Sequence, residues 1–425
     1  MARSHRLALA TRGESRHTTS GFVGEARSTP GTASPHRLTR RDDPGARRRA
    51  CHGLLALALA ACSPAETPPE TPPTPSPIRA PPPDKPAAPE KREPREVPPV
   101  RKDGTVYAES YHMGTRFSIN LWIGDRSASD AGLAIEAALD EIERIEQIAS
   151  EWRPTSELSQ LNDAAGGAMR PMSPELFEIL QRSKLIAEAT DGAFDPSFYG
   201  VGQLWKFDEG AAPPRPEEIS AKLSLVDWRA IELDPNTSTG RLQKPGMKLG
   251  LGAIAKGYGV DRAALVLVQH GFTHHVVEGG GDTYASGTKG GKPWRVGIQR
   301  PDRPGSLAAI PASDRAIVTS GDYQRFFEHN GRRYAHILDP KTGWPIPEER
   351  SCQSVTLLAR DATDADAYAT AIAVMGPEKG MAFVEAHPDL EAVIITRTGE
   401  MLVSKDLAPT LIMPTPPPTD GAKAG

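Results

Sequence analysis

The sequence predicts an α+β protein in which one folded region lies between two proline-rich segments. Apolar residues at helical and at alternating spacing are mixed along residues 104–408, with frequent hairpin signals and no strict strand–helix–strand order. The 41 prolines of the 425 residues concentrate in residues 63–100 and near the C-terminus. Such composition buries too little apolar surface to offset chain entropy. We therefore expect an extension with a signal peptide (1–62), a disordered linker (63–103), one folded domain (104–408) and a disordered tail (409–425).

The first half of the folded region begins with a strand pair. Residues 107–122 alternate between apolar and polar side chains, with a turn at 113–115. Residues 133–148 and 176–189 have apolar residues at helical spacing, and Ser-Pro at 173–174 is a helix-start signal.

The second half mixes further helices and strands. A short strand is expected from the alternation of Met247, Leu249 and Leu251, followed by a glycine-rich turn. Asn-Gly at 330–331 predicts a hairpin turn. The remaining expected elements are helices at 260–269, 361–375 and 379–386 and strands at 274–278, 294–299, 316–320, 392–396 and 401–404.

The N-terminal region has the features of an export signal. Three arginines at 47–49 precede an apolar run at 53–61 that is too short to span a bilayer, and Cys62 follows directly. Leu-Ala-Ala-Cys at 59–62 resembles a bacterial lipoprotein box, in which the cysteine is lipidated; an ordinary secretory peptide is the alternative. We expect a lipid-anchored protein at the bacterial cell envelope, facing the periplasm, with the proline-rich segment as a stiff tether.

Charge and cysteine content exclude other classes. The net charge is −4 and the folded region has no basic block, so nucleic-acid binding has no support. Besides Cys62, only Cys352 remains after processing, which excludes a disulfide framework; Cys352 is expected to be a small core residue.

Residues 249–262 (Leu-Gly-Leu-Gly-Ala-Ile-Ala-Lys-Gly-Tyr-Gly-Val-Asp-Arg) predict a glycine-rich helix start. Unpaired N–H groups and the helix dipole suit an anion there, with Lys256 as a nearby cation. Residues 252–257 have P-loop spacing, but Tyr258 follows where Lys-Ser/Thr is required, and no dinucleotide-binding G-x-G-x-x-G occurs. The alternative is that these glycines only permit close packing.

Asp366 and Thr370 lie four residues apart on one face of an expected helix. A carboxylate beside a hydroxyl suits Mg²⁺, although a solvated aspartate and a packed threonine explain the same spacing. His336 ends an expected strand, where it is either a general base or a packing residue. No zinc-protease or serine-hydrolase motif accompanies it.

Eight short motifs follow one another along the folded region. They are Met-Gly-Thr (113–115), Glu-Trp-Arg-Pro-Thr-Ser-Glu-Leu-Ser-Gln-Leu-Asn (151–162), Thr-Asp-Gly-Ala-Phe-Asp-Pro (190–196), Gly-Ala-Ile-Ala-Lys-Gly-Tyr (252–258), Gly-Gly-Asp (280–282), Thr-Ser-Gly-Asp-Tyr (319–323), His-Ile-Leu-Asp-Pro-Lys-Thr-Gly (336–343) and Asp-Ala-Tyr-Ala-Thr-Ala (366–371). In the order and spacing of these motifs, the chain resembles the ApbE family of bacterial FAD:protein FMN transferases. The resemblance implies a single T-fold-related α+β catalytic domain.

The resemblance also implies a reaction and its residues. The enzyme would transfer FMN from FAD to a Thr or Ser hydroxyl of an acceptor flavoprotein subunit in a membrane redox complex, releasing AMP. Mg²⁺ ligands would be Asp366, Thr370 and the carbonyl of Ala253, with His336 as the catalytic base. FAD contacts would come from Met113, Trp152, Ala193, Phe194, Asp195, Lys256, Leu338 and the position of Gly250.

Two departures from the family pattern affect this assignment. Gly250 stands where related sequences often have Asp, so a carboxylate contact to FAD is missing, and Glu278-Gly279 precede the Gly-Asp turn where Asn is common. The alternatives are an FAD pyrophosphatase giving FMN and AMP, and a non-catalytic lipid-anchored flavin-binding protein.

Overall fold

The computed structural model describes residues 6–7, 98–208, 210–322 and 325–414. The predicted signal peptide with Cys62, the linker up to residue 97 and the tail from residue 415 lie outside the described residues, so these predictions remain untested. Among the described residues, no helix combines the length and apolar character needed to cross a membrane.

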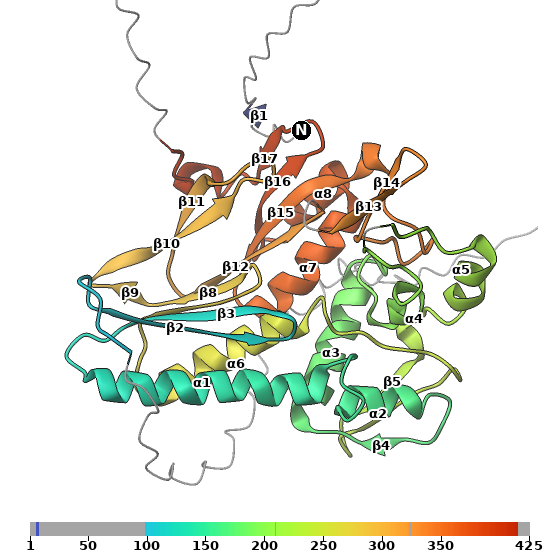
Figure 1. Ribbon diagram of the computed structural model, residues 1–425, viewed down its shortest axis with the longest axis horizontal. Helices are drawn as coiled ribbons and strands as arrows, with labels where there is room; N and C mark the ends of the chain where they lie inside the picture. Colours follow the sequence, from blue (N-terminus) through green and yellow to red (C-terminus); the bar gives the residue numbers. More distant parts are fainter. Residues whose placement is uncertain (1–5, 8–97, 209, 323–324, 415–425) are drawn as a thin grey trace, which may run out of the picture. The chain divides into compact units, whose positions relative to one another are not determined.

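A large antiparallel sheet organises the described part of the chain (Figure 1). Within the described ranges nine strands pair in the order β1-β17-β16-β15-β12-β8-β7-β3-β2. Their bounds are β1 Arg6–Leu7, β2 Thr105–His112, β3 Thr115–Trp122, β7 His275–Gly279, β8 Asp282–Ser286, β12 Arg315–Gly321, β15 Cys352–Ala359, β16 Glu391–Thr396 and β17 Met401–Val403.

Helices cover one face of this sheet. Figure 1 shows α1 (Ala128–Ala149) and α6 (Ala255–Gln269) side by side beneath β2 and β3. α7 (Ala362–Met375) packs on α6, β12 and β15, and α8 (Pro377–Ala386) packs on α7 and β16. The core between helices and sheet includes Phe117, Ile119 and Leu121, the buried face of β3. The predicted alternation of residues 107–122 is thereby confirmed.

A second sheet packs on the other face of the large one. It contains β9 (Thr288–Lys289), β10 (Lys292–Gln299) and β11 (Ser306–Ala312). Apolar residues of β10 and β11 form a core with Ile317, Leu358 and Val393 of the large sheet. Ile412 continues this packing through backbone hydrogen bonds with Ala309.

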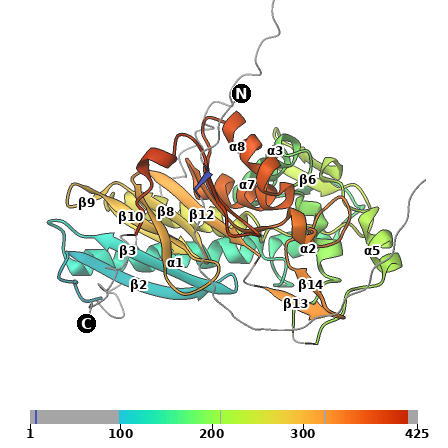
Figure 2. The ribbon, with the colours of Figure 1, turned by 90° about the horizontal axis from the view of Figure 1, so that it is seen from above.

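A smaller group of elements includes α4, whose Tyr199 and Gly202 line the candidate site. It comprises α2 (Glu157–Asp163), β4 (Arg170–Pro171), α3 (Pro174–Ala189), α4 (Tyr199–Gly202), α5 (Pro216–Leu223), β5 (Ile231–Asp234), β6 (Thr239–Leu242) and the hairpin of β13 (Phe326–His329) and β14 (Arg332–Ala335). Aromatic packing of Trp205, which lies between α4 and α5, against Phe327 and Tyr334 holds the hairpin to this segment. Figures 1 and 2 show β13 and β14 on the same side of the structure as α5. Asn330 has the positive φ of 50° that its predicted turn requires.

The strand predicted from Met247, Leu249 and Leu251 is wrong. All three side chains are buried, as the alternation indicated, but the segment pairs with no strand. Instead, the side chain of Asn162 accepts from the Leu249 N–H at 2.7 Å and donates to its carbonyl at 2.9 Å. An amide side chain therefore replaces the neighbouring strand as the backbone's hydrogen-bond partner.

His275 makes the stability of this fold sensitive to acid. Its side chain is fully buried in β7, and burial lowers its pKa from 6.5 to about 4. Between these values the unfolded chain binds a proton that the folded chain does not, so stability is complete above pH 6.5 and falls as the pH drops. We expect the free energy of unfolding to fall by about 2 kcal/mol between pH 7 and pH 5 from this group alone. Denaturant titrations of the wild type and of His275→Gln should differ in pH dependence by that amount; equal pH dependence contradicts the prediction.

Candidate active site

A cavity of about 930 Å³ brings most of the predicted site residues together. Its size falls within the range of small-molecule sites, about 300–1,000 Å³. The predicted residues that line it are Trp152, Ala193, Phe194, Asp195, Gly250, Ala253, Lys256, His336, Leu338, Asp366 and Thr370. The whole lining comes from loops and elements between residues 151 and 374, so the fold assembles the cleft from segments that are distant in sequence.

A buried ion cluster forms one part of the cavity wall. Lys256 Nζ lies 2.8 Å from the Asp282 carboxylate and 2.8 and 2.9 Å from the two oxygens of Asp366. Both carboxylates are almost fully buried. Burial and the neighbouring Asp366 raise the pKa of Asp282 well above its ordinary value. Burial alone would lower the pKa of Lys256, but the two carboxylates outweigh it and raise that pKa.

A close approach of two helices positions this cluster. A Cβ atom on Gly257, in the first turn of α6, would lie 2.0 Å from the carbonyl oxygen of Ala362 in α7. Only glycine permits this approach, which also lets the Gly257 N–H donate to Asp366 at 3.3 Å. The glycine-rich start of α6 therefore permits close helix packing. Its Gly257 N–H group also binds an anion, which is the carboxylate of Asp366.

A two-glycine turn places the other carboxylate. Gly280 and Gly281 have φ values of 60° and 102°, which side-chain-bearing residues rarely adopt. This turn joins β7 to β8, and Asp282 is the first residue of β8. The sequence motif was recognised, but Asp282 was not predicted as a site residue, because its pairing with Lys256 depends on tertiary structure.

His336 lies on the cavity wall just after β14. Its backbone N–H donates to the Arg325 carbonyl at 3.1 Å, and its Nδ1 lies 3.2 Å from the same oxygen. A carbonyl only accepts, so Nδ1 carries the proton and Nε2 is the basic nitrogen of the ring. Burial, with the positive charge of Arg325, lowers the pKa of His336 below its usual value, against the hydrogen bond to the Arg325 carbonyl. The neutral form is therefore favoured near pH 7, as a general base requires.

The predicted FAD-contact residues that line the cavity differ in how exposed their side chains are and in which residues they contact. Trp152 is 75% exposed and meets Tyr199 edge-on, whereas Phe194 is buried. The Asp195 carboxylate accepts from the Ser197 and Trp228 N–H groups at 2.8 and 3.2 Å, so it stabilises its own turn and connects that turn to the segment at Trp228. Burial raises the pKa of Asp195.

Met113 is the predicted site residue that does not line this cavity. It occupies the β2–β3 turn with a φ of 49°, and its backbone N–H donates to Glu146 at 2.8 Å. Its side chain packs between the two main hydrophobic cores.

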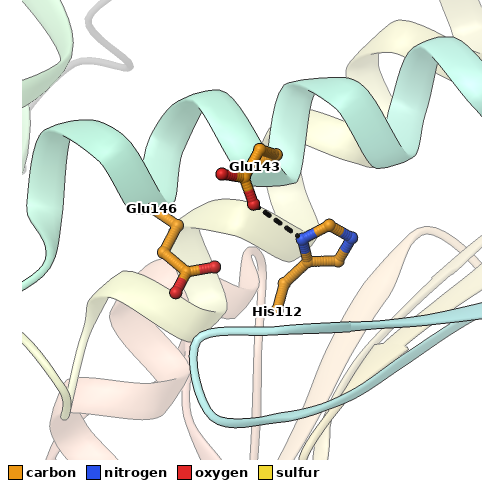
Figure 3. Close-up of side chains that lie close together, drawn as sticks. All are labelled: His112, Glu143 and Glu146. Atoms are coloured by element: carbon orange, nitrogen blue, oxygen red, sulfur yellow. Dashed lines mark hydrogen bonds and ion pairs between the residues drawn. The ribbon is translucent and has the colours of Figure 1, made fainter. Parts of the chain in front are cut away.

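A separate cluster of potential metal ligands lies beside that turn. Figure 3 shows His112 with Glu143 and Glu146, whose ligand atoms lie within 4.8 Å of one another. Arg153 already pairs with Glu143 at 2.7 Å and with Glu146 at 3.0 Å. The guanidinium supplies the positive charge that these carboxylates need, so the cluster is a structural tie between α1 and its neighbours.

Several residues of the cavity wall were not predicted from the sequence, and two of them lie beside Trp152. These two, Glu151 and Tyr199, line the cavity together with Trp152. Glu151 precedes Trp152 within a recognised motif, and burial raises the pKa of its carboxylate. Tyr199 had no sequence signal beyond being an aromatic residue after a turn.

A cleft of this size with a lysine–carboxylate cluster, a neutral histidine and an aromatic wall is typical of an enzyme active site. The sequence pattern of the ApbE family matches residues 113–394. The FAD:protein FMN transferase of Treponema pallidum (strain Nichols) is 36% identical over 301 residues, 67% of this chain and 82% of that protein. The one from Klebsiella pneumoniae (strain 342) is 31% identical over 306 residues, 71% of this chain and 93% of that protein.

Solved structures agree with these sequence matches. The ApbE protein of Thermotoga maritima MSB8 superposes with a TM-score of 0.66 at 30% identity, covering 72% of this chain and 99% of that one. The flavin transferase ApbE from Vibrio cholerae gives a TM-score of 0.63 at 30% identity, with the same coverage. The chain therefore belongs to the ApbE family. This membership confirms the predicted family, the α+β fold and the prediction of an enzyme of the class to which these FAD:protein FMN transferases belong.

Proposed function

We propose that this chain transfers the FMN half of FAD to a Thr or Ser hydroxyl of an acceptor protein through a phosphoester bond and releases AMP. Both relatives described above, from Treponema pallidum and Klebsiella pneumoniae, are named FAD:protein FMN transferase, which supports the proposal. The observation that carries the proposal is the single cavity in which His336 shares a wall with Lys256, Asp366 and Thr370. Binding a flavin needs none of these groups, whereas phosphoryl transfer uses a base and charge stabilisation.

The proposed step conserves atoms and charge. The acceptor oxygen bonds to the phosphorus of the FMN phosphate, and the bond from that phosphorus to the oxygen bridging the two phosphates breaks. AMP leaves with that oxygen, and the acceptor proton moves to Nε2 of His336. Lys256 pairs with the carboxylates of Asp282 and Asp366 in the same cavity wall, so it neutralises part of their negative charge and holds both side chains in place.

The donor set fits the Mg²⁺ that the resemblance implies. Asp366, Thr370 and the carbonyl of Ala253 line the cavity and offer hard oxygen ligands, and no thiol is among the residues that line it. The two carboxylates of Asp282 and Asp366 pair with one ammonium, that of Lys256. When both carboxylates are ionised, the cluster has a net negative charge that a bound cation would balance. When bound, Mg²⁺ would neutralise negative charge on the pyrophosphate.

Cellular context belongs to the proposal as well. We infer that Cys62 is lipidated, that the enzyme faces the periplasm, and that its acceptors are subunits of membrane redox complexes. The apolar run and cysteine at 53–62 and the proline-rich segment that follows support this placement.

An in-gel fluorescence assay tests the proposed reaction. The purified protein is incubated with FAD, Mg²⁺ and a candidate acceptor domain, and AMP is quantified in parallel. We expect a fluorescent acceptor band and one AMP for each flavin attached. Free FMN and AMP without a labelled acceptor would show hydrolysis instead, and intact FAD would show binding without turnover; either result contradicts the proposal.

A further inference from the structure

The ring of Tyr199 lies directly against the backbone of Gly250. A Cβ atom at Gly250 would come within 2.9 Å of Tyr199 Cβ and Cδ2 and 3.0 Å of its Cγ. The Gly250 N–H also donates to the Pro196 carbonyl at 2.9 Å, which fixes the two segments together. Gly250 is not among the described glycines with a positive φ, so its backbone conformation does not itself require glycine. The side chain of Tyr199, its Cβ atom as well as its ring, is what excludes a side chain at position 250.

Tyr199 and Trp152 form a right-angled aromatic corner in the cavity wall. Their ring centroids are 5.8 Å apart with an interplanar angle of 83°. The Tyr199 hydroxyl donates to the Glu151 carbonyl at 3.3 Å, which holds the ring beside the residue that precedes Trp152. Trp152 leaves 75% of its surface exposed at a lined cavity. A planar ring that stacks on one of these aromatics meets the edge of the other, a favourable geometry for both contacts.

We propose that Tyr199 and Gly250 act as a coupled specificity pair, which together with Trp152 forms a subsite for one planar heterocycle of the dinucleotide substrate. Because the tyrosine ring takes the volume of any side chain at position 250, this part of the wall recognises its ligand through aromatic contact. With glycine at position 250, this part of the wall has no side-chain carboxylate or amide that could hydrogen-bond to polar groups of the ligand. The inference rests on the proposed function, since the heterocycle is either the adenine or the isoalloxazine of FAD.

Binding measurements without turnover test the ring contact. Titrations with FAD, FMN and AMP are followed by fluorescence in EDTA without acceptor. We expect Tyr199→Ala to weaken FAD binding about tenfold, because one base–aromatic contact is lost. Tyr199→Phe keeps the ring and should stay within about twofold of the wild type. If Tyr199→Ala binds FMN more weakly than the wild type does, the isoalloxazine occupies the subsite. If it binds AMP more weakly, the adenine does. Unchanged affinity of Tyr199→Ala for all three ligands overturns the proposal.

A double-variant cycle tests the coupling. Gly250→Ala should weaken FAD binding, about tenfold or more, because the ring must move. In a Tyr199→Gly background the same change should cost less than about twofold, since the obstructing ring is absent. Equal cost in both backgrounds overturns the coupling. If Gly250→Ala alone does not fold, recovery of a cooperative thermal transition in the double variant gives the same answer.

A matched control separates this inference from the proposed function. Tyr111 on β2 is 77% exposed and does not line the cavity, so Tyr111→Ala should bind FAD as the wild type does. A wild type that does not bind FAD contradicts the proposed function itself. A wild type that binds FAD, with Tyr199→Ala binding equally well, contradicts only the specificity pair.

Discussion

Replacing Asp366 with asparagine is expected to abolish flavin transfer while leaving the fold intact. The change keeps the shape of the side chain but removes the carboxylate from a cavity where it pairs with Lys256 and offers a hard oxygen to a metal. Removing one buried electrostatic contributor to phosphoryl transfer costs on the order of 10²–10³-fold in rate. Both acceptor labelling and AMP release should fall by at least this much, and Mg²⁺ titration should show weaker dependence on the metal.

The control for this variant lies two residues earlier on the same helix. Asp364→Asn makes the same chemical change on α7, but Asp364 pairs with Arg182 and does not line the cavity. It should retain transfer activity within a few-fold. Because Lys256 keeps Asp282 as a partner, thermal unfolding of Asp366→Asn should remain cooperative. A variant at position 366 with normal turnover would overturn the assignment of the cluster to catalysis.

Replacing His336 with glutamine is expected to lower kcat by about 10²–10⁴-fold, the usual contribution of a positioned general base. The affinity for FAD should change little, since the histidine is assigned to the acceptor proton. Single-turnover labelling together with equilibrium FAD titration separates these two quantities. His329→Gln is the matched control, because His329 lies on the same hairpin and does not line the cavity.

The pH profile gives a second measure of the same group. The pKa of His336 is lowered, so the base is already neutral at pH 7 and is lost only as the pH falls below the usual histidine value of 6.5. The acid limb of kcat/KM should therefore lie below pH 6.5 in the wild type and disappear in the residual activity of His336→Gln. An acid limb above pH 7 would show that another group controls the rate.

The sequence was most informative where one face of an element is buried. The alternation in residues 107–122 predicted β2 and β3 because Phe117, Ile119 and Leu121 form one continuous apolar face. Likewise, Ser173 caps α3 through the Leu176 N–H, as the Ser-Pro signal indicated. The burial of one strand face and the capping of a helix depend on residues close together in the sequence, so the sequence alone can predict them.

Elements decided by tertiary contacts were harder to predict. The helix expected to begin at residue 260 begins at Ala255. Its first turn contains Gly257, which has low helix propensity but permits the close packing of α7. β11 was not predicted, since the run Ser-Leu-Ala-Ala-Ile-Pro-Ala has few β-branched residues and gains its stability from packing on the large sheet.

The same distinction applies to the candidate site. Residues inside recognised motifs, such as Lys256 and Asp366, could be named from the sequence and do line the cavity. Asp282 and Tyr199 became visible only through the partners that folding gives them, Lys256 and Gly250 respectively. A single sequence contains no signal for such pairs, because their members are far apart along the chain.

The contact between Lys256 and Asp366 joins residues that are 110 positions apart in sequence. Such a contact closes a long loop, which carries an entropic cost, and it requires that the chain through residue 366 is present. The cleft therefore cannot exist in a nascent chain that ends before α7, nor in a chain that is threaded unfolded across a membrane. If the chain is exported as proposed above, this requirement confines FAD binding to the compartment in which the whole domain folds.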